Sequence, residues 1–336
     1  MINYKKSASE ILKEIQKSKR ILLHLHPGPD GDSVGGSLAM MHYLISLGKK
    51  VTLISGDSDP PTYLSSLPGF KKIRNQTFQK TNLKKYDLFI ILDSADLSQI
   101  TKLGEVIFPK NLITITIDHH HANPKYSDIN LIDKEAPATC QILYKLFKLW
   151  KLNITPEIAA CLFIGIYQDT MFKYPGTSSL TFEICADLTK IYPDFTKIIF
   201  NMENNNDPSR LKLQGIALNS IETYLDNHLA ISSISNQDIT NNSFTTNNIS
   251  GSDIANILKS VIGWTIVAHI IEYQPDHCKI SFRTRNAKKY DVSKIAMAVG
   301  SGGGHKAAAG ATVNLSLIET KKHIVNIVNK IYPQLN

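Results

Sequence analysis

Four short apolar segments in the first half of the chain constrain its fold more than any other feature. They are ILLHLH at 21–26, VTLIS at 51–55, LFIILD at 88–93 and LITITID at 112–118. Short, continuous apolar runs of this kind are typical of strands buried on both faces of a parallel sheet. Helical patterns accompany them, an amphipathic one at 8–19 and SLAMMHYLISLG, which ends at Gly48. The pattern predicts an α/β fold with a Rossmann-like parallel sheet.

The rest of the sequence predicts further helices and a second group of strands. Helices are expected at 137–151, 156–168, 178–190, 209–224 and 316–331. The later strands are LAISSIS from 229, WTIVAHIIEY from 264, CKISFRT from 278 and ATVNLSL from 311. The polar, Asn-rich stretch 236–253 is predicted to be a loop. This change from helical patterns to paired strands predicts a catalytic domain at 1–205, a linker helix region at 206–228 and a smaller α/β domain at 229–336.

The chain has no apolar stretch that would direct it to a membrane. Its N-terminus lacks the apolar core of a signal peptide, and nothing approaches the ~18 apolar residues of a membrane span. We therefore expect a cytoplasmic protein that does not bind membranes. Four cysteines are scattered without a CxxC pair, so buried reduced thiols are expected instead of a zinc finger or a disulfide framework.

The formal net charge is +8, and the lysines that produce it are spread along the whole chain. A basic surface attracts phosphates and acidic partners. Solvated lysines on helix faces account for the charge equally well. Composition therefore leaves a nucleic-acid surface open.

Candidate metal ligands follow three of the predicted strands. In open α/β sheets, ligands bind beyond the carboxyl ends of the strands, so these side chains can converge at one edge. Turn chemistry explains Gly28, Pro29 and Gly31 after the first strand, but it explains a histidine and two carboxylates in the same turn less well. The candidates are His26, Asp30, Asp32, Asp93, Asp118, His119, His120 and, at the end of a helix, Asp169.

These candidates predict a site with two divalent cations. Carboxylates a few ångströms apart repel each other strongly at reduced dielectric, and cations would neutralise them. Oxygen and imidazole ligands without cysteine suit Mn²⁺ or a similar first-row ion. The number of candidate ligands exceeds one octahedron, and two metals about 3.5–4 Å apart are used for phosphoryl displacement.

At these residues the sequence resembles the DHH phosphoesterase superfamily. His26-Pro-Gly-Pro29-Asp30-Gly31-Asp32 matches its first motif, and Asp93, Asp118-His119-His120 and Gly165-Ile-Tyr-Gln-Asp169 match the next three. GSGGGHKAAAG at 300–310, preceded by SFRTRN, resembles the glycine-rich signature of the DHHA1 domain. The nearest type is the stand-alone NrnA-like group, which acts on short oligonucleotides, on 3′-phosphoadenosine 5′-phosphate (pAp), or on cyclic di-AMP and its linear product pApA.

The resemblance implies a role for each candidate in the catalytic domain. The first Mn²⁺ would be held by His26, Asp30 and Asp93, and the second by Asp32, Asp93, His119 and Asp169. His120 would face the substrate phosphate as a general acid or a charge stabiliser. Asp118 would orient the adjacent imidazoles instead of binding metal. His121, which extends the histidine run, is predicted to be a loop residue.

The resemblance also implies a substrate-binding role for the second domain. Successive glycines let backbone N–H groups approach a phosphate, and neighbouring basic side chains can clamp it or stack on a base. The residues expected to bind substrate are Arg283, Arg285, Gly302, Gly303, Gly304, His305 and Lys306.

These observations predict a Mn²⁺-dependent phosphodiesterase that hydrolyses short dinucleotides such as pApA and cyclic di-AMP. The alternative is a nanoRNase and pAp phosphatase, and a non-catalytic nucleotide-binding regulator is more remote. A structural protein that binds long nucleic acid would show steeply salt-dependent binding to duplexes. We expect short oligonucleotide or cyclic dinucleotide partners, no long duplex, other divalent ions as substitutes for Mn²⁺, and a chain that can form a homodimer.

Overall fold

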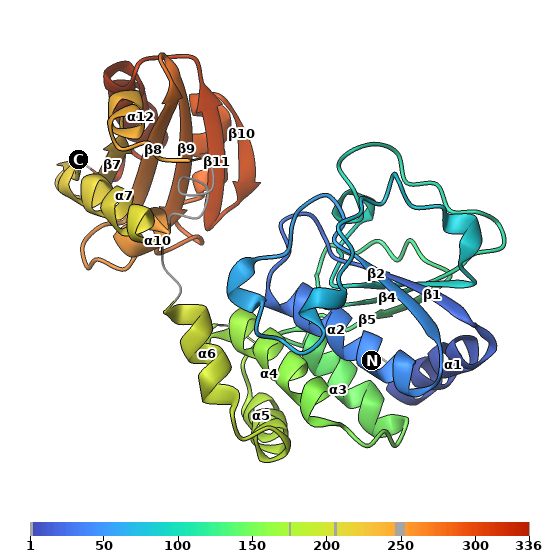
Figure 1. Cartoon of the computed structure of the whole chain (residues 1–336). Helices are drawn as coiled ribbons and strands as arrows, with labels where there is room; N and C mark the ends of the chain where they lie inside the picture. Colours follow the sequence, from blue (N-terminus) through green and yellow to red (C-terminus); the bar gives the residue numbers. More distant parts are fainter. Residues whose placement is uncertain (1–2, 175, 205–206, 246–252, 336) are drawn as a thin grey trace. The chain divides into compact units, whose positions relative to one another are not determined.

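The computed structural model describes residues 3–174, 176–204, 207–245 and 253–335 (Figure 1). The chain divides into two compact units, Met1–Asn205 and Asn206–Asn336. Each unit contains one sheet and its own hydrophobic core.

The first unit contains a five-stranded sheet with the strand order β2-β1-β3-β4-β5, and all neighbouring strands are parallel. The strands are β1 (Arg20–His24), β2 (Lys50–Ile54), β3 (Leu88–Leu92), β4 (Ile113–Asp118) and β5 (Ile129–Ile132). The predicted α/β fold with a parallel sheet is confirmed, and β5 is a strand that the apolar pattern did not reveal.

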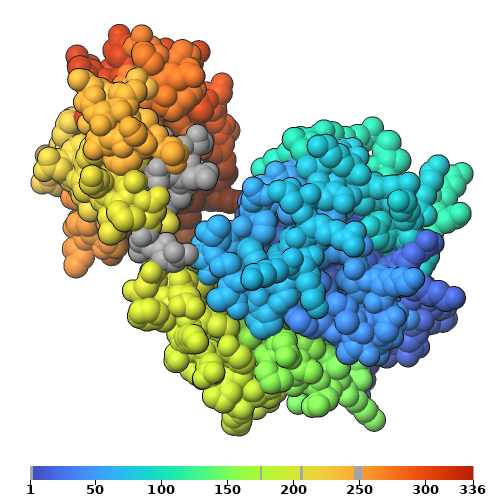
Figure 2. Space-filling model, in the orientation of Figure 1, coloured from blue at the N-terminus to red at the C-terminus, as the bar shows by residue number. Residues whose placement is uncertain are grey.

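Burial on both faces explains the continuous apolar runs. Side chains alternate across a strand, so Leu22 and Phe89 enter one core while Leu23 and Ile90 enter the other. Helices α2, α3 and α4 pack against one another over one face of the sheet (Figure 1). Phe78, Ile100 and Leu112, from the segments that connect the strands, belong to the other core. Figure 2 shows the side chains of the 55–80 region, in light blue, at the front of this unit, and Leu64 and Leu67 of this region belong to the same core as the helices.

The helices of the first unit follow the predicted order, with one addition. They are α1 (Tyr4–Lys17), α2 (Gly31–Ser46), α3 (Thr139–Leu149), α4 (Pro156–Thr170), α5 (Ser179–Ile191) and α6 (Phe195–Glu203). Short 3-10 helices occur at Thr62–Leu64, Phe70–Lys72, Leu83–Lys85 and Leu97–Gln99. The sequence pattern did not predict α6. All four cysteines are buried and free, as expected.

The second unit contains a six-stranded mixed sheet with the order β10-β11-β9-β8-β7-β6. Its strands are β6 (Glu222–Tyr224), β7 (Leu229–Ile234), β8 (Ile266–Gln274), β9 (His277–Thr284), β10 (Ser301–His305) and β11 (Ala308–Val313). The pair β7–β8 is parallel and the other pairs are antiparallel. Its helices are α7 (Pro208–Asn219), α8 (Asn236–Asn241), α10 (Ile254–Lys259), α11 (Val292–Val299) and α12 (Leu317–Ile331), followed by a 3-10 helix at Pro333–Leu335.

Two predictions for this unit are wrong in detail. The stretch expected to be a loop at 236–253 begins with α8, because Ser235 and Asp238 form a capping box that starts a helix in a polar sequence; residues 246–252 lie outside the described residues. The helix expected at 209–224 ends at Asn219, and β6 follows.

The range 206–228, expected to be a linker, contains α7 and β6. On α7, Leu213 and Ala217 are buried in one core cluster with Ala230 and Ile234 of β7. These elements are therefore part of the second unit. No helix in the described ranges combines the length and the apolar run that a bilayer crossing requires.

Candidate metal centre

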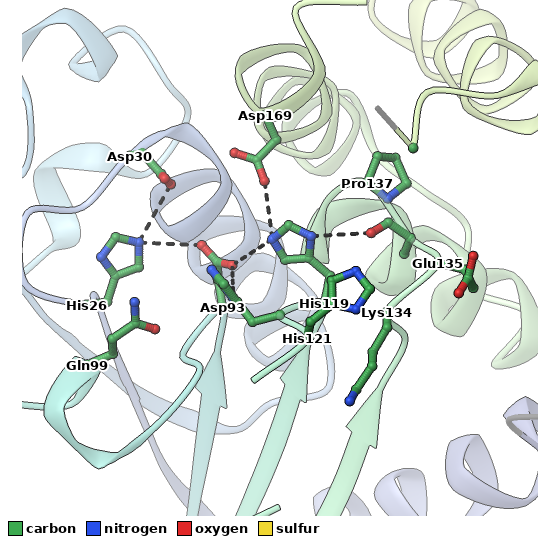
Figure 3. A pocket seen from close by; sticks show the side chains of 13 residues that line it. His26, Asp30, Asp93, Gln99, His119, His121, Lys134, Glu135, Pro137 and Asp169 are labelled. Atoms are coloured by element: carbon green, nitrogen blue, oxygen red, sulfur yellow. Dashed lines mark hydrogen bonds and ion pairs between the residues drawn. The ribbon is translucent and has the colours of Figure 1, made fainter. Parts of the chain in front are cut away.

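Histidines and aspartates from four segments meet at the carboxyl edge of the parallel sheet (Figure 3). His26 Nε2 lies 3.4 Å from Asp93 Oδ2. His119 Nε2 lies 3.4 Å from Asp93 Oδ1 and 3.4 Å from Asp169 Oδ2. The structure therefore brings together ligands that are up to 143 residues apart in sequence, from 26 to 169. Parallel strands favour the convergence of His26, Asp93 and His119, because their carboxyl ends share one edge, and α4 adds Asp169.

Asp93 occupies the middle of the cluster. It follows β3 directly, its side chain is buried, and its two oxygens face different histidines. Its φ angle is 52°, in the left-handed region that aspartate tolerates better than most residues. The backbone remains tied to the sheet, because Asp93 N–H donates to the carbonyl of Ile117 at 3.1 Å. One carboxylate is thus placed to bridge two sites.

Two groups of ligand atoms lie around Asp93, and each could hold a cation. One group is His26, Asp30 and Asp93, and another is Asp32, His119 and Asp169; the ligand atoms of each group lie within 4.8 Å of one another. Asp93 belongs to the first group, and its Oδ1 lies 3.4 Å from His119 of the second. A third overlapping group is Asp93, His119 and His120. Nitrogen and oxygen donors without thiolate fit a divalent first-row cation or Mg²⁺.

Buried carboxylates lie close together in this cluster and repel one another. Burial, together with the carboxylates of Asp32 and Asp93, raises the pKa of Asp169 to about 10. Burial and the charge of Asp93 raise the pKa of Asp32 to about 7. Bound divalent cations would relieve the same repulsion. The donor set and its charge fit divalent metal ions.

The two candidate ligand histidines are oriented through their other ring nitrogens. His119 Nδ1 lies 3.3 Å from the carbonyl of Ala136, and His26 Nδ1 lies 3.2 Å from the carbonyl of Pro27. A backbone acceptor at Nδ1 fixes the tautomer that leaves Nε2 free as a ligand. Burial lowers the pKa of both imidazoles, but hydrogen bonds to the aspartates around them outweigh it and raise each to about 10.

Asp118 holds His120 instead of facing the cluster. The Asp118 side chain is fully buried, and its Oδ1 accepts hydrogen bonds from His120 Nδ1 at 2.7 Å and from the backbone N–H of His119 at 2.8 Å. Its Oδ2 accepts from Asn123 Nδ2 at 2.8 Å. The hydrogen bond to Asp118 raises the pKa of His120, which lines the pocket. With Nδ1 engaged, Nε2 is the atom of His120 that is available to a substrate.

Sequence reasoning missed Thr139 and Asn123. Thr139 begins α3; its hydroxyl donates to Asp93 Oδ1 at 3.2 Å and its backbone N–H donates to Asp32 Oδ2 at 2.5 Å. Cys140 N–H donates to Asp32 Oδ1 at 2.8 Å, so the N-terminus of α3 binds that carboxylate. Asn123 ties Asp118 to the carbonyl of Ser94. A polar residue at a helix start, and an amide just after the histidine run, were the available signals.

The cluster opens into a pocket of about 620 Å³, within the range of small-molecule sites. Beyond the metal-ligand candidates, the pocket is lined by Gln99, His121, Lys134, Glu135, Ala136, Pro137 and Gly176. Of these residues, Ala136 also orients His119 through its carbonyl. Figure 3 shows most of them beside the cluster.

The predicted substrate-binding residues all lie in the second unit. The glycine-rich segment, for which a flexible turn was the alternative, forms the β10–β11 hairpin. Ala308 pairs with both His305 and Arg283, so these two side chains belong to the same end of the sheet. Arg283 donates to Asn256 Oδ1 at 3.2 Å, and Arg285 donates to the carbonyls of Ser260 and Val261. Both arginines therefore have a structural function, and their role in substrate binding stays a prediction.

Comparison with known families decides the classification. Residues 20–166 match the model of the DHH family, N-terminal domain, and residues 228–332 match that of the DHHA1 domain. The chain belongs to the DHH/DHHA1 superfamily. The resemblance seen in the motifs is confirmed, and the chain is a phosphoesterase of this superfamily.

Two relatives of this DHH/DHHA1 protein carry the name bifunctional oligoribonuclease and PAP phosphatase NrnA. The Thermus thermophilus protein is 26% identical over 329 residues, covering 96% of this chain and 92% of the relative. The Bacillus subtilis protein is 25% identical over 317 residues, covering 91% and 93%. An exopolyphosphatase-related protein from Bacteroides fragilis has the same fold, with a TM-score of 0.86 at 24% identity over 98% of this chain and 97% of that chain.

Proposed function

We propose that the protein is a Mn²⁺-dependent phosphodiesterase that hydrolyses short nucleotides. The observation that carries this proposal is the two ligand groups beside Asp93, which belongs to the group of His26 and lies 3.4 Å from His119 of the other group. The names of the two relatives support short oligoribonucleotides and pAp as substrates. We extend the proposal to pApA and cyclic di-AMP, because these are short adenine nucleotides with the same linkage chemistry.

The residues at the centre suit two divalent cations, one for each ligand group. Such cations, when bound, would neutralise the scissile phosphate and supply an ionised water as the nucleophile. His26, Asp30, Asp32, His119 and Asp169 would hold them, with Asp93 shared. Other divalent ions that accept oxygen and imidazole ligands can substitute for Mn²⁺.

His120 would carry out the proton transfer that the reaction needs. Hydrolysis of a phosphodiester breaks the bond from phosphorus to the leaving oxygen, and that oxygen requires a proton. The hydrogen bond to Asp118 favours the protonated imidazole, so His120 enters the reaction as an acid. Asp118 fixes the direction of Nε2, as a carboxylate does behind other catalytic histidines.

The test is a product analysis of the full-length protein supplied with Mn²⁺. The substrates are pAp, pApA, cyclic di-AMP and a 24-mer RNA, separated by chromatography. We expect rapid cleavage of pApA and pAp, slow or no cleavage of the 24-mer, and loss of all activity in Asp93→Asn. Asp276→Asn, which removes one carboxylate from an exposed turn of the second unit, is the matched control and keeps the activity.

The cyclic substrate separates two versions of this function. Rapid conversion of cyclic di-AMP to pApA would make the protein a second-messenger enzyme, whereas cleavage of pApA and pAp alone would make it a nanoRNase and pAp phosphatase. If none of the substrates is cleaved, a nucleotide-binding regulator on the same scaffold replaces the catalytic proposal.

A further inference from the structure

Two tight turns flank the metal centre and present side chains that the proposed reaction does not use. In the first turn, Ala136 N–H donates to the carbonyl of Asp133 at 3.1 Å, which leaves Lys134 and Glu135 at the exposed central positions. In the second, residues 120–123, Asn123 N–H donates to the carbonyl of His120 at 3.4 Å, and His121 is exposed.

Both turns are fixed to the metal centre by hydrogen bonds. At one end of the first turn, Asp133 N–H donates to the carbonyl of Asp118 at 2.9 Å. At the other end, the carbonyl of Ala136 accepts from His119 Nδ1, which lies 3.3 Å away. The second turn is held by the side chain of Asn123, which donates to Asp118 Oδ2. The turns that carry Lys134 and His121 are therefore hydrogen-bonded to the same residues that position His119 and His120.

Lys134 is the only lysine or arginine among the described residues that line this pocket. It has no ion pair within 4.0 Å in the described part of the chain, although Glu135 is its neighbour. The other charged groups in the pocket are carboxylates and the imidazoles of the cluster. Once cations occupy the cluster, the carboxylates there would be neutralised, and Lys134 would be the one lysine or arginine among the described lining residues, with the imidazole of His121 on the second turn.

We propose that Lys134 and His121 form a subsite for a second phosphate of the substrate, one nucleoside away from the phosphate that is hydrolysed. This subsite lies wholly in the first unit, beside the DHH residues. The ammonium of Lys134 contributes charge, and the imidazole of His121 contributes a hydrogen bond to the phosphate oxygens. The subsite would favour substrates with two phosphates, such as pAp and pApA, over their singly phosphorylated counterparts. This inference rests on the proposed function and specifies its substrate class.

The experiment compares pApA with ApA, which differ only in the terminal phosphate. The measured quantity is the ratio of kcat/KM for pApA to kcat/KM for ApA, in full-length protein with Mn²⁺. We expect the ratio to fall at least about fivefold in Lys134→Gln, because a hydrogen bond to a charged group is lost. Lys134→Arg restores most of it. Lys110→Gln removes an exposed lysine that does not line the pocket and keeps the wild-type ratio.

Glu135 tests whether removing a negative charge changes the pApA/ApA ratio in the opposite direction. Its carboxylate lines the same pocket from the same turn, so Glu135→Gln removes a repulsion and raises the ratio. A general loss of the metal centre would lower turnover of both substrates equally and leave the ratio unchanged in Lys134→Gln. Either that result or an unchanged ratio in Lys134→Gln/His121→Gln overturns the proposal.

Binding measured without turnover separates this inference from the proposed function. Calorimetry uses pApA and ApA whose internal linkage is a phosphorothioate, which resists hydrolysis. If the wild type cleaves none of the natural substrates, the phosphodiesterase proposal fails. The subsite is then supported by a preference for pApA binding that Lys134→Gln reduces, and it is overturned if binding shows no such preference.

Discussion

Asp118 and His120 lie two residues apart and are joined by a 2.7 Å hydrogen bond from imidazole Nδ1 to carboxylate Oδ1. The bond turns Asp118 away from the metal-ligand groups, in which it does not appear. Within the DHH run, therefore, His119 is a ligand candidate, His120 faces the pocket, and Asp118 serves both of them through its Oδ1.

This relationship predicts the effect of Asp118→Asn. The amide has nearly the same shape but lacks the charge that stabilises a protonated His120. We expect kcat to fall by at least about a hundredfold while Mn²⁺ binding stays within about threefold of wild type. Steady-state kinetics and calorimetric titration with Mn²⁺ measure the two effects. A parallel loss of metal binding would show that Asp118 is a ligand instead of an orienting residue.

For Asp93→Asn we expect Mn²⁺ binding itself to be lost. Because Asp93 belongs to the group of His26 and Asp30, and its Oδ1 lies 3.4 Å from His119 of the second group, its loss should impair both cation sites at once. We expect the stoichiometry of tight Mn²⁺ binding, measured by equilibrium dialysis, to fall from two ions to none. Asp30→Asn touches only one group and should leave one tight ion. Retention of two ions in Asp93→Asn would exclude a bridging role.

Thr139 provides a positioning test at the same carboxylate. Thr139→Val keeps the size of the side chain but removes the hydroxyl that donates to Asp93. Residues that support a ligand in this way typically change metal affinity by about 10–100-fold, so we expect the dissociation constant for Mn²⁺ to rise about tenfold. Thr139→Ser should restore the affinity. If Val and Ser behave alike, the hydroxyl has no part in holding Asp93.

The glycine-rich hairpin gives a matched pair of stability variants. A Cβ on Gly302 would lie 2.6 Å from the carbonyl oxygen of Gly310 and 2.7 Å from that of Ala296, whereas a Cβ on Gly303 meets nothing within 4 Å. Gly302→Ala should therefore destabilise the protein by about 1–3 kcal/mol, as overpacking does. Gly303→Ala should change the free energy of unfolding by less than about 1 kcal/mol. Urea denaturation measures both, and equal effects would contradict the packing argument.

His269 predicts a pH dependence of stability in the second unit. It is buried on β8, its Nδ1 lies 2.8 Å from the hydroxyl of Ser232, and its Nε2 has no hydrogen-bond partner among the described residues. Burial lowers its pKa to about 4. Between about pH 6.5 and 4 the unfolded chain therefore binds more protons at this residue than the folded protein does.

The direction of the pH effect on stability follows from this difference in bound protons. The contribution of neutral His269 is complete above about pH 6.5 and is lost as the pH falls towards 4, by about 3 kcal/mol in all. His269→Gln, which does not titrate, should show a flatter decline of unfolding free energy over that interval, whatever its stability at pH 7. Denaturation curves at several pH values compare the two slopes, and identical slopes would contradict the prediction.

Much of the first unit was predictable because each of its signals is local. A buried parallel strand needs an apolar run, so β1 to β4 stand out in the sequence. β5 did not stand out, since Ile129 and Asn130 are only partly buried and the strand is short. In the second unit, helix α8 was missed because it begins at a capping box and has no apolar face that a sequence pattern would reveal.

The sequence by itself determined which chemistry the chain could carry, because the histidines and aspartates of the metal centre follow strand ends in recognisable motifs. Only the tertiary structure decided their geometry: that Asp93 lies between two histidines, that Asp118 turns to His120, and that the N-terminus of α3 holds Asp32. These contacts join residues 2 to 108 positions apart. A linear pattern encodes strand burial and turn type, but it doesn't encode which distant backbone groups are brought within hydrogen-bond reach when the layers pack.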